Sequence, residues 1–538
     1  MVEESRYENG GAPFMNDSTK LARVIVRQII EAGVKDVVIS PGSRNAPLSL
    51  AFYEASTRGL IKLHIRIDER TAAFFALGIA KATGRPVPIV CTSGTAVANY
   101  HPAVLEASHS NLPLLVLTAD RPAELRKTGA NQTTQQAKIF GSAVRYFADI
   151  SGVAYPMELP FNSLQSGPVH LNIQFSEPLS PDEKSGWLDA ITIKEPTIFT
   201  RKGAGTFFTK STRGVLVIGH DRGGFSVESV AEFAKKLNWP VISEDPLSFD
   251  SAISHASLFL ANRAIADELR PDTVVTIGRT TLSRSINGFV ATARKKIVID
   301  PRILTTDSDR IADQRFSALP AVEVPEADAE YLERFIKYSV RTAKAVNEIS
   351  IWSEQLVARE IGSSIPTGTA LFISSSRPIR DFEGFAAARS GVETFANRGL
   401  AGIDGNISTA LGIASQRKET IAVLGDLSFL HDVTGFIQSE EINAKFFIIN
   451  NNGGGIFSTL SHRGTEGFEE VFGTPHNLDP AAISTAFGLK AKTISSLSEL
   501  LTEVTEPVSG ISVVVVNVPN REENATHLEK FIAGLASI

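Results

Sequence analysis

The chain has 538 residues, of which 43% are apolar and 21% charged, as in ordinary multidomain globular proteins. Its formal net charge of −6 argues against the basic face that nucleic-acid binding needs, and its single cysteine, Cys91, excludes an internal disulfide framework and a cysteine metal cluster. No apolar run approaches the roughly 20 residues that span a bilayer. We therefore expect a cytoplasmic protein that acts on small molecules, with residues 1–16 as a disordered leader.

Helical and strand-like segments alternate from residue 17 onward. The first block, residues 17–185, begins with an amphipathic helical stretch at 21–32. Its strand-like runs lie at 37–39, 62–67, 87–91, 114–118 and 169–173. Alternation of this kind predicts a parallel sheet with helices on both faces. A stretch rich in Pro, Glu and Lys, at about 177–202, is predicted to be the linker that ends this domain.

Two further α/β blocks follow the linker. The second block, residues 203–328, has strand-like runs at 215–219, 241–242, 274–278 and 297–300. The third block, residues 331–538, starts with a helix near Tyr331 and has runs at 371–373, 420–425, 446–450 and 512–518. The absence of a short-period repeat excludes solenoids and propellers. The predicted fold class is therefore α/β, with three doubly wound parallel-sheet domains.

Polar residues and glycines follow two predicted strands of the third block. Gly425-Asp426 comes directly after the run at 421–424, and Asn450-Asn451-Asn452-Gly453-Gly454-Gly455 follows the run at 446–449. Open α/β sheets bind ligands at the carboxyl ends of their strands. A carboxylate, an amide oxygen and a backbone carbonyl from two such loops are hard ligands suited to Mg²⁺. Either turn alone could simply punctuate a strand, but the pair predicts a magnesium and diphosphate site.

A glutamate of the first block lies between a predicted strand and a predicted helix. Glu69 falls between the runs at 62–67 and 71–82, where an acid can also be an ordinary partner of the helix dipole. Two motifs flank it in the sequence, Ile39-Ser40-Pro41-Gly42-Ser43-Arg44 and Thr92-Ser93-Gly94-Thr95-Ala96-Val97-Ala98-Asn99. With the metal pattern, these motifs resemble the thiamine-diphosphate-dependent enzymes. The resemblance implies that Glu69 is the catalytic acid that protonates the aminopyrimidine of the cofactor.

The same resemblance implies a complete cofactor site. Asp426, the Asn451 side chain and the Gly453 carbonyl would hold Mg²⁺ or Mn²⁺, and Ile403 would support the cofactor in a bent shape. The residues implied to bind thiamine diphosphate are Glu69, Gly402, Ile403, Leu427, Ser428, Asn451 and Ile456. In this family the glutamate of one subunit reaches the diphosphate-binding domain of another. A homodimer at least is therefore implied, with a dimer of dimers as the alternative.

Further motifs narrow the resemblance to the 2-succinyl-5-enolpyruvyl-6-hydroxy-3-cyclohexene-1-carboxylate synthases of menaquinone biosynthesis. They are Ile39 to Leu48, Thr118-Ala119-Asp120-Arg121-Pro122, Gly129-Ala130-Asn131-Gln132, Asn397 to Gly405 and Gly425-Asp426-Leu427-Ser428. The implied reaction decarboxylates 2-oxoglutarate and adds the succinic semialdehyde carbanion to isochorismate. One departure is the segment 149–167, which is too short for the helix that usually precedes the next strand.

Arginines in the motif loops agree with substrates that carry two carboxylates each. Guanidinium groups bind carboxylates through two parallel hydrogen bonds. The positions that match the anion-binding residues of the family are Arg44, Arg121, Arg380 and Arg398, with Ser43, Gln132 and Ser376 as neutral partners and Arg284 as a looser match. Phe457 and Leu460 are expected to form apolar walls of the substrate site, although core packing is a nearly equal alternative for them. The ten histidines show no metal-ligand spacing.

The middle block permits a function of another class. The run at 215–219 precedes Asp221-Arg222-Gly223-Gly224, a weak match to a nucleotide-binding loop. A flavin or nucleotide bound there would make this block a regulatory module, whereas the more ordinary interpretation is a structural turn.

Among enzymes, the alternative is a carboligase similar to acetolactate synthase or benzaldehyde lyase. Substrates of that kind would not need several arginines, and turnover of pyruvate without isochorismate would support this alternative.

Overall fold

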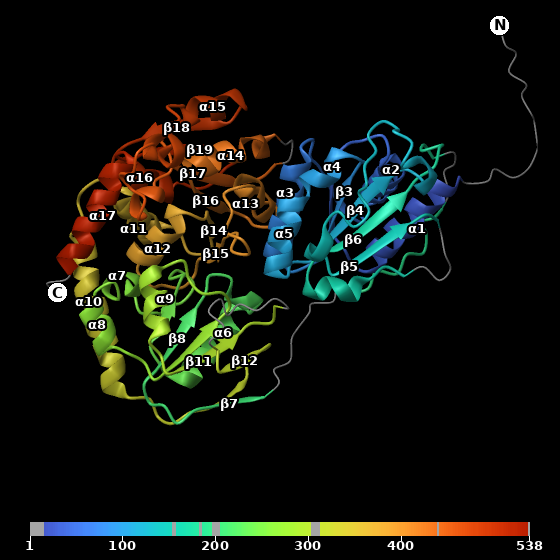
Figure 1. Ribbon diagram of the computed structural model, residues 1–538. Coiled ribbons are helices and arrows are strands. Elements are labelled where there is room, and N and C mark those ends of the chain that lie inside the picture. Colours follow the sequence, from blue (N-terminus) through green and yellow to red (C-terminus); the bar gives the residue numbers. More distant parts are fainter. Residues whose placement is uncertain are drawn as a thin grey trace, which may run out of the picture. The chain divides into compact units, whose positions relative to one another are not determined.

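The computed structural model describes most of the chain, in two compact units (Figure 1). The described residues are 16–152, 158–181, 186–195, 205–302, 312–437 and 441–535. The predicted leader, up to residue 15, and parts of the predicted linker lie outside them. The first unit comprises Met1–Ala76, Arg85–Val104 and Pro113–Ile198, and the second comprises Leu77–Gly84, Leu105–Leu112 and Phe199–Ile538. Each unit is described by itself.

The first unit is built on a six-stranded parallel sheet with the strand order β2-β1-β3-β4-β6-β5. The strands are β1 (Asp36–Ile39), β2 (Lys62–Ile65), β3 (Val87–Cys91), β4 (Leu114–Asp120), β5 (Tyr146–Ile150) and β6 (Val169–Gln174). The helices that lie wholly or partly in this unit are α1 (Asp17–Glu31), α2 (Ala46–Thr57), α3 (Glu69–Thr83), α4 (Thr95–Asn99) and α5 (His101–Ser110). The central strands β1, β3 and β4 are buried throughout, which is why they read as continuous apolar runs.

The second unit contains a five-stranded and a six-stranded parallel sheet. The five-stranded sheet has the order β12-β11-β10-β8-β9, with β8 (Gly214–Ile218), β9 (Val241–Ser243), β10 (Thr273–Ile277), β11 (Lys295–Ile299) and β12 (Gln314–Phe316). A separate two-stranded ribbon pairs β7 (Thr206–Phe208) with β13 (Ala321–Glu323). The helices of this part are α6 (Val227–Leu237), α7 (Ala256–Phe259), α8 (Arg263–Glu268) and α9 (Arg284–Ala291).

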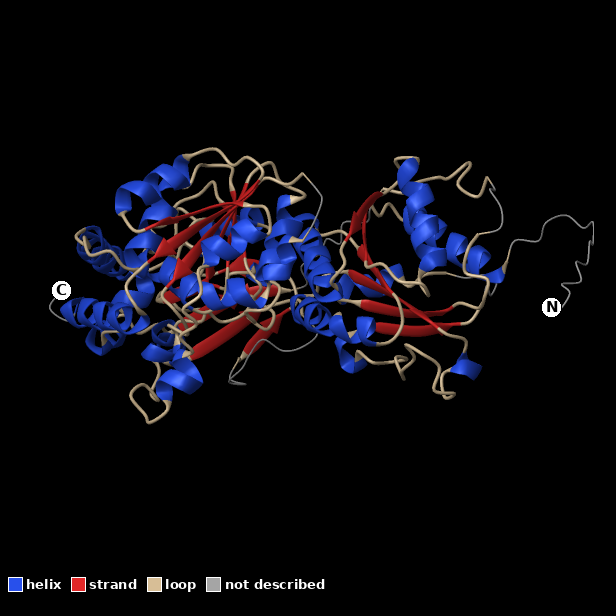
Figure 2. Ribbon diagram, turned by 90° about the horizontal axis from the view of Figure 1, so that it is seen from above, coloured by secondary structure: helices blue, strands red, loops and turns tan. Residues whose placement is uncertain are grey.

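The six-stranded sheet of the second unit has the order β15-β14-β16-β17-β19-β18. Its strands are β14 (Ala370–Ile373), β15 (Glu393–Phe395), β16 (Thr420–Gly425), β17 (Ala444–Asn450), β18 (Lys490–Ile494) and β19 (Ile511–Asn517). The helices are α10 (Ala329–Asn347), α11 (Glu354–Ser364), α12 (Arg377–Phe385), α13 (Asn406–Ala414), α14 (Asp426–His431), α15 (Pro480–Ala486), α16 (Leu497–Thr505) and α17 (Arg521–Leu535). Helices lie on both sides of the strands in each unit (Figure 2).

The predicted fold class is confirmed, because each of the three blocks forms an all-parallel sheet. Every strand-like run named from the sequence is a strand, and the helix near Tyr331 is α10. The strands that were not predicted are mostly short or partly exposed. One of them, β18, is an edge strand with three of its five residues exposed, so neither an apolar run nor strict alternation marks it. The three domain boundaries stay predictions.

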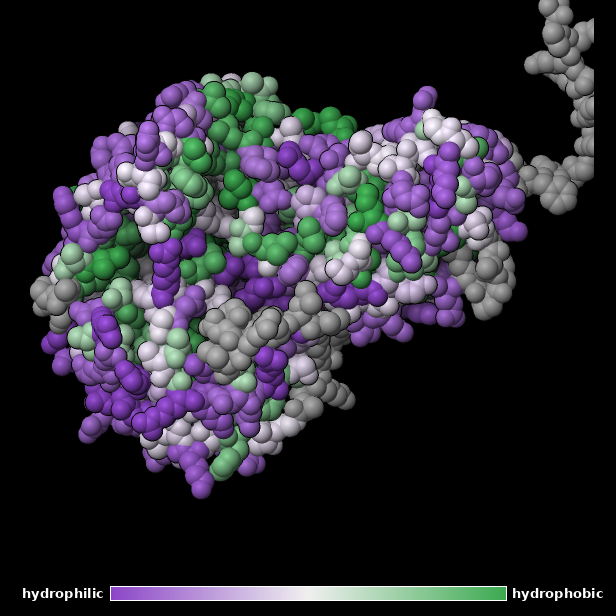
Figure 3. Space-filling model, in the orientation of Figure 1, coloured by the Kyte–Doolittle hydropathy of each residue, from purple (hydrophilic) through white to green (hydrophobic). Residues whose placement is uncertain are grey.

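The short segment before β6 holds no long helix in its described part. Residues 153–157 lie outside the described ranges, and the rest of the connection from β5 contains one 3₁₀ helix, Phe161–Ser166. No described helix is long and apolar enough to cross a membrane. Figure 3 shows hydrophilic residues over much of both units, with apolar areas over the part of the second unit that carries the six-stranded sheet.

The six-stranded sheets share one topology. In each, the first strand lies between the second and the third, so the chain winds in one direction and then in the other. The loops that leave the carboxyl ends of the first and third strands therefore diverge and open a crevice. This point lies between β1 and β3 in the first unit and between β14 and β16 in the second. The sequence motifs that follow β1, β3 and β16 fall at these points, and the others follow the neighbouring strands β4, β15 and β17.

A neutral histidine lies in the core of the first unit. His170 on β6 is fully buried, with the Phe140 and Phe147 ring centroids 4.8 and 5.2 Å from its own. Thr118 donates its hydroxyl hydrogen to Asn172, so His170 Nε2 must donate to Thr118 Oγ1 over 2.7 Å. Nδ1 is left without a partner among the described residues. Burial lowers the pKa of His170 to about 3, because a second proton would bring an uncompensated charge into the core.

We expect this histidine to make the first unit sensitive to mild acid. Above about pH 6.5, the usual pKa of histidine, His170 is mostly neutral in both states. Below this pH the unfolded chain binds a proton at His170, whereas the folded chain does not until the pH nears its lowered pKa of about 3. Between pH 7.5 and 5.5 the wild type should lose about 1.4 kcal/mol more unfolding free energy than His170→Gln. Hydrogen–deuterium exchange of the β6 peptides across a urea series measures this difference. Equal losses in the two proteins would contradict it.

Candidate active site

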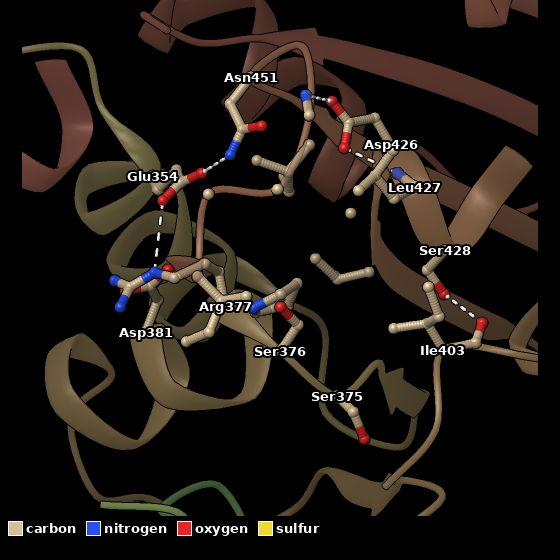
Figure 4. Close-up of a pocket in the computed structure, with 18 of the residues that line it drawn as sticks. Glu354, Ser375, Ser376, Arg377, Asp381, Ile403, Asp426, Leu427, Ser428 and Asn451 are labelled. Atoms are coloured by element: carbon tan, nitrogen blue, oxygen red, sulfur yellow. Dashed lines mark hydrogen bonds and ion pairs between the residues drawn. The ribbon is translucent and has the colours of Figure 1, made fainter. Parts of the chain in front are cut away.

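A cavity of about 150 Å³ lies where the strand order reverses in the six-stranded sheet of the second unit (Figure 4). Loops that follow β14, β16 and β17 contribute to its walls. The predicted residues that line it are Ser376, Ile403, Asp426, Leu427, Ser428, Asn451, Gly453, Ile456 and Phe457. Gly402, predicted to bind the cofactor, is not among the lining residues but directly precedes Ile403. The structure therefore brings together residues from four segments of the chain, which follow β14, β15, β16 and β17.

The Asp426 carboxylate joins two of these loops. It lies at the first position of α14 and is 2% exposed. One oxygen accepts the Leu427 N–H over 2.7 Å, and the other accepts the Gly453 N–H over 2.9 Å, from the loop after β17. His476 Nε2 lies 3.2 Å from the second oxygen. Three donors thus hold a buried carboxylate at the edge of the cavity, and further lone pairs remain for a cation.

The glycine run after β17 is required by close backbone approach. Gly453 has φ of 138°, a region that side chains rarely adopt, and a Cβ there would lie 2.1 Å from the carbonyl oxygen of Gly473. A Cβ on Gly455 would lie 2.4 Å from Asn451 Nδ2. The run therefore lets the loop fold tightly and leaves room for the amide of Asn451.

Asn451 presents an unpartnered oxygen in this site. Its Nδ2 donates to Glu354 Oε1 over 2.5 Å, whereas its Oδ1 is buried and has no hydrogen-bond partner among the described residues. A buried acceptor without a donor is costly unless a ligand completes it. An amide oxygen next to the Asp426 carboxylate suits a hard divalent cation, so these residues fit the predicted metal. The described residues hold no cluster of three His, Cys, Asp or Glu side chains that could bind a metal.

The loop that carries Ile403 is held by two polar side chains. Ser428 Oγ and Asn406 Nδ2 both donate to the Ile403 carbonyl, over 3.0 and 2.9 Å, and Asn406 Nδ2 also donates to Ser428 Oγ over 2.8 Å. These bonds fix the backbone on either side of the cavity, and the Ile403 side chain forms part of its wall (Figure 4). Ser428 is thus engaged with the backbone in this structure, and its contact with a diphosphate stays a prediction.

A second, larger hollow of about 360 Å³ is lined by three arginines. Arg284 comes from the start of α9, and Arg377 and Arg380 come from α12. Predicted Leu460 and Ile456 line the same hollow, and Ile456 and Arg377 also line the smaller cavity. Ser376 has φ of 77° and accepts from Arg380 through its carbonyl over 2.6 Å. Burial lowers the pKa of Arg380, with the neighbouring Arg377 adding to the effect.

Arg398, also predicted to bind substrate, lines neither cavity. It is 4% exposed, and its guanidinium donates to both carboxylate oxygens of Glu244 at 3.0 to 3.3 Å. A third contact goes to the Thr280 carbonyl over 3.3 Å. In this structure Arg398 therefore links the loop after β15 to the five-stranded sheet. Its contact with a substrate carboxylate stays a prediction.

The remaining predicted residues lie at strand ends of the first unit. Glu69 begins α3, just after β2, and is half-buried. Ser43 and Arg44 follow β1, and Ser43 is exposed. Arg44 donates to the Phe175 carbonyl over 3.0 Å.

Arg121 follows β4 and donates to Ser93 Oγ over 3.0 Å and to the Gln132 carbonyl over 2.8 Å. The Gln132 side chain is exposed, and its φ of 55° is unusual for this residue type. Glu69, Ser43, Arg44, Arg121 and Gln132 belong to the first unit and the metal candidates to the second, so the expectation that a partner subunit joins the two sets stays a prediction.

Four titratable residues of the site were missed by the sequence analysis. They are Glu354, Arg377, Asp381 and His476. Arg377 directly follows the predicted Ser376, and its position next to a predicted site residue could have identified it. Glu354 reaches Asn451 from the start of α11, almost one hundred residues away in the chain, so no local pattern could have revealed it. His476 touches Asp426 from a loop of irregular structure.

Family models and named relatives match this chain over most of its length. The models described as the N-terminal TPP binding domain, the middle domain and the C-terminal TPP binding domain of thiamine pyrophosphate enzymes match residues 19–139, 182–373 and 384–518. The chain is 35% identical to the 2-succinyl-5-enolpyruvyl-6-hydroxy-3-cyclohexene-1-carboxylate synthase of Saccharopolyspora erythraea, over 95% of this chain and 98% of the relative. The enzymes of the same name from Thermobifida fusca and a Nocardioides species are 36% and 37% identical, over 88% and 97% of this chain and 91% and 99% of their own lengths.

These matches confirm the predicted cofactor class, because the matched domains are those that bind thiamine pyrophosphate. They also cover the motif loops on which the sequence resemblance rested. The chain belongs to the 2-succinyl-5-enolpyruvyl-6-hydroxy-3-cyclohexene-1-carboxylate synthase family of thiamine pyrophosphate enzymes.

Proposed function

We propose that this protein decarboxylates 2-oxoglutarate and transfers the remaining four-carbon unit to isochorismate, with release of CO₂. The product is 2-succinyl-5-enolpyruvyl-6-hydroxy-3-cyclohexene-1-carboxylate, the compound in the printed names of its relatives. One observation carries the proposal: the Asp426 carboxylate and the unpartnered Asn451 oxygen line one cavity at the point of strand-order reversal. A metal-bound diphosphate fits such a site.

Thiamine diphosphate, when bound, supplies the electron sink that allows a 2-oxo acid to lose CO₂. Asp426, Asn451 and the Gly453 carbonyl would hold the Mg²⁺ or Mn²⁺ that the diphosphate needs. Ile403 supports the cofactor from the side of the cavity, with Leu427 and Ile456 on the other walls. Glu69, from a partner subunit, holds a proton at the aminopyrimidine ring. At least a homodimer is therefore part of the proposal.

The arginines of the larger hollow bind the substrate carboxylates. Arg284 and Arg380 line it together, and each charge-assisted bond contributes roughly 1.5 to 3 kcal/mol. Both proposed substrates carry two carboxylates, so several cationic groups near the cofactor are needed. Phe457 and Leu460 exclude water from the apolar side of the substrates. The remaining proposed substrate contacts are Ser43, Arg44, Arg121, Gln132, Ser376 and Arg398. The cytoplasmic location stays a prediction.

The reaction itself is tested with the purified protein, thiamine diphosphate and Mg²⁺. We expect isochorismate to disappear and CO₂ to form in equal amounts when 2-oxoglutarate is present, and neither change when any one component is left out. Absorbance of isochorismate and a coupled CO₂ assay follow the two changes. Turnover of pyruvate without isochorismate would instead favour an enzyme similar to acetolactate synthase.

The metal assignment is tested with Asp426→Ala. Loss of this carboxylate should weaken binding of Mn²⁺ in the presence of thiamine diphosphate by about 100-fold or more, because a hard ligand is lost. Electron paramagnetic resonance of free Mn²⁺ measures the affinity directly. Glu470→Gln, which removes an exposed acid near the same loops, is the matched control and should bind as the wild type does. Unchanged Mn²⁺ affinity in Asp426→Ala would refute the site.

The acid assignment is tested with Glu69→Gln. This change keeps the shape of the side chain but removes the proton-holding group, so kcat should fall by about 10²- to 10⁴-fold. Cofactor affinity, measured by calorimetry, should change far less. The exposed Glu124 provides the control substitution Glu124→Gln. A variant with near wild-type kcat would show that another group serves as the acid.

A further inference from the structure

We infer that Glu354 is the positioning residue that aims the amide oxygen of Asn451 at the metal. This inference rests on the proposed metal site and names a residue that acts on one of its ligands. An asparagine side chain has a donor end and an acceptor end of nearly equal size, and only the oxygen can bind a cation. A neighbouring group must therefore set the orientation of the Asn451 amide.

The carboxylate of Glu354, which can only accept hydrogen bonds when ionised, sets this orientation. Glu354 Oε1 lies 2.5 Å from Asn451 Nδ2, and an ionised carboxylate can face only a donor at this distance. The Asn451 oxygen is thereby turned away from Glu354, and it is the atom without a partner among the described residues. Figure 4 shows Glu354 and Asn451 on one side of the cavity, with the dashed bond between them.

Glu354 is itself held firmly. It is 5% exposed, and its backbone N–H donates to Asn524 Oδ1 over 3.0 Å. Ser353 caps α11 by accepting from the Leu356 N–H, which fixes the turn that carries Glu354. A buried group with a fixed backbone cannot swing to another partner without leaving charges unpaired.

An arginine occupies the other side of the carboxylate. Arg377 Nε lies 3.5 Å from Glu354 Oε2, and the Arg377 guanidinium is bound by Asp381 one helical turn further along α12. Arginine is a donor only, so Glu354 stands between two donors, Asn451 and Arg377. Burial raises the pKa of Glu354, and Arg377 and Asn451 oppose that rise. A group at position 354 must accept on both sides to keep this arrangement.

Glutamine at this position cannot accept on both sides. In Glu354→Gln the new carbonyl oxygen faces the donor Arg377, which leaves the new NH₂ group toward Asn451. Two facing NH₂ groups repel, so the Asn451 amide turns over and presents its nitrogen to the metal. The structure thus predicts a specific defect from a substitution that changes the volume hardly at all.

A second substitution, at position 451, should compensate for this defect. In Glu354→Gln/Asn451→Asp, the new carboxylate at 451 accepts from the glutamine with one oxygen and keeps the other for the metal. The number of carboxylates around the site equals that of the wild type. In Asn451→Asp alone, the new carboxylate faces Glu354 and the two repel. Each single variant should therefore bind metal poorly, and the double variant should recover.

The experiment measures Mn²⁺ affinity by electron paramagnetic resonance in the full-length protein with thiamine diphosphate. We expect about 10- to 100-fold weaker binding in each single variant, as for other partners of metal ligands, and recovery to within a few-fold in the double variant. The matched control is Glu360→Gln. It alters another acid of α11, which is partly buried and paired with Arg359, and this variant should bind Mn²⁺ as the wild type does. Thermal melting of every variant shows whether it is folded.

The outcomes separate the inference from the metal site on which it rests. If Asp426→Ala loses Mn²⁺ but Glu354→Gln binds as the wild type does, only the inference is wrong. If the double variant binds no better than Glu354→Gln, Glu354 has a structural role and the inference is also wrong. If Asp426→Ala itself binds Mn²⁺ normally, the proposed metal site fails first.

Discussion

The bond between the Asp426 carboxylate and the Gly453 N–H is the contact on which the site depends. It joins the loops that follow β16 and β17, two neighbouring parallel strands paired from Thr420 with Ala444 to Gly425 with Ile449. A buried carboxylate needs hydrogen-bond donors, and a backbone N–H is a donor that cannot move away on its own. The two loops therefore keep one relative position, and the cavity between them keeps its shape.

Buried charges around the site divide the arginines into two groups. Arg398 is fully engaged with Glu244, and this pair connects the two sheets of the second unit. Arg284 and Arg380 instead line the larger hollow, where we propose that they bind substrate carboxylates. Removal of one member of a buried pair leaves an uncompensated charge. Loss of Arg398 would therefore disturb packing as well as any contact with a ligand, whereas loss of Arg284 would act mainly on binding.

The five-stranded sheet carries the loop that weakly matches a nucleotide-binding pattern. Its loop after β8 is closed by Asp221, which accepts the Gly223 N–H and pairs with Arg302. These partly buried contacts outweigh the effect of burial and hold the pKa of Asp221 below its usual value. The segment belongs to the middle domain of thiamine pyrophosphate enzymes. The Asp221 carboxylate thus bonds within the chain, as expected of a structural turn, whereas both ring nitrogens of His220 in the same loop are buried without a hydrogen-bond partner among the described residues. The alternative of a bound nucleotide stays untested.

The sequence by itself determined the local features: the buried parallel strands, the Gly-Asp turn after β16 and the glycine run after β17. Their physics is local, since apolar runs form buried strands and only glycine fits where Gly453 and Gly455 meet other atoms. Edge strands such as β18 were not predicted from the sequence, because their residues are largely exposed and carry no clear pattern. Only the tertiary structure decided which polar groups meet. The contacts of Glu354 with Asn451, of Arg398 with Glu244 and of His476 with Asp426 join residues far apart in the chain, and hydrogen bonds between distant segments depend on the packing of whole sheets and helices.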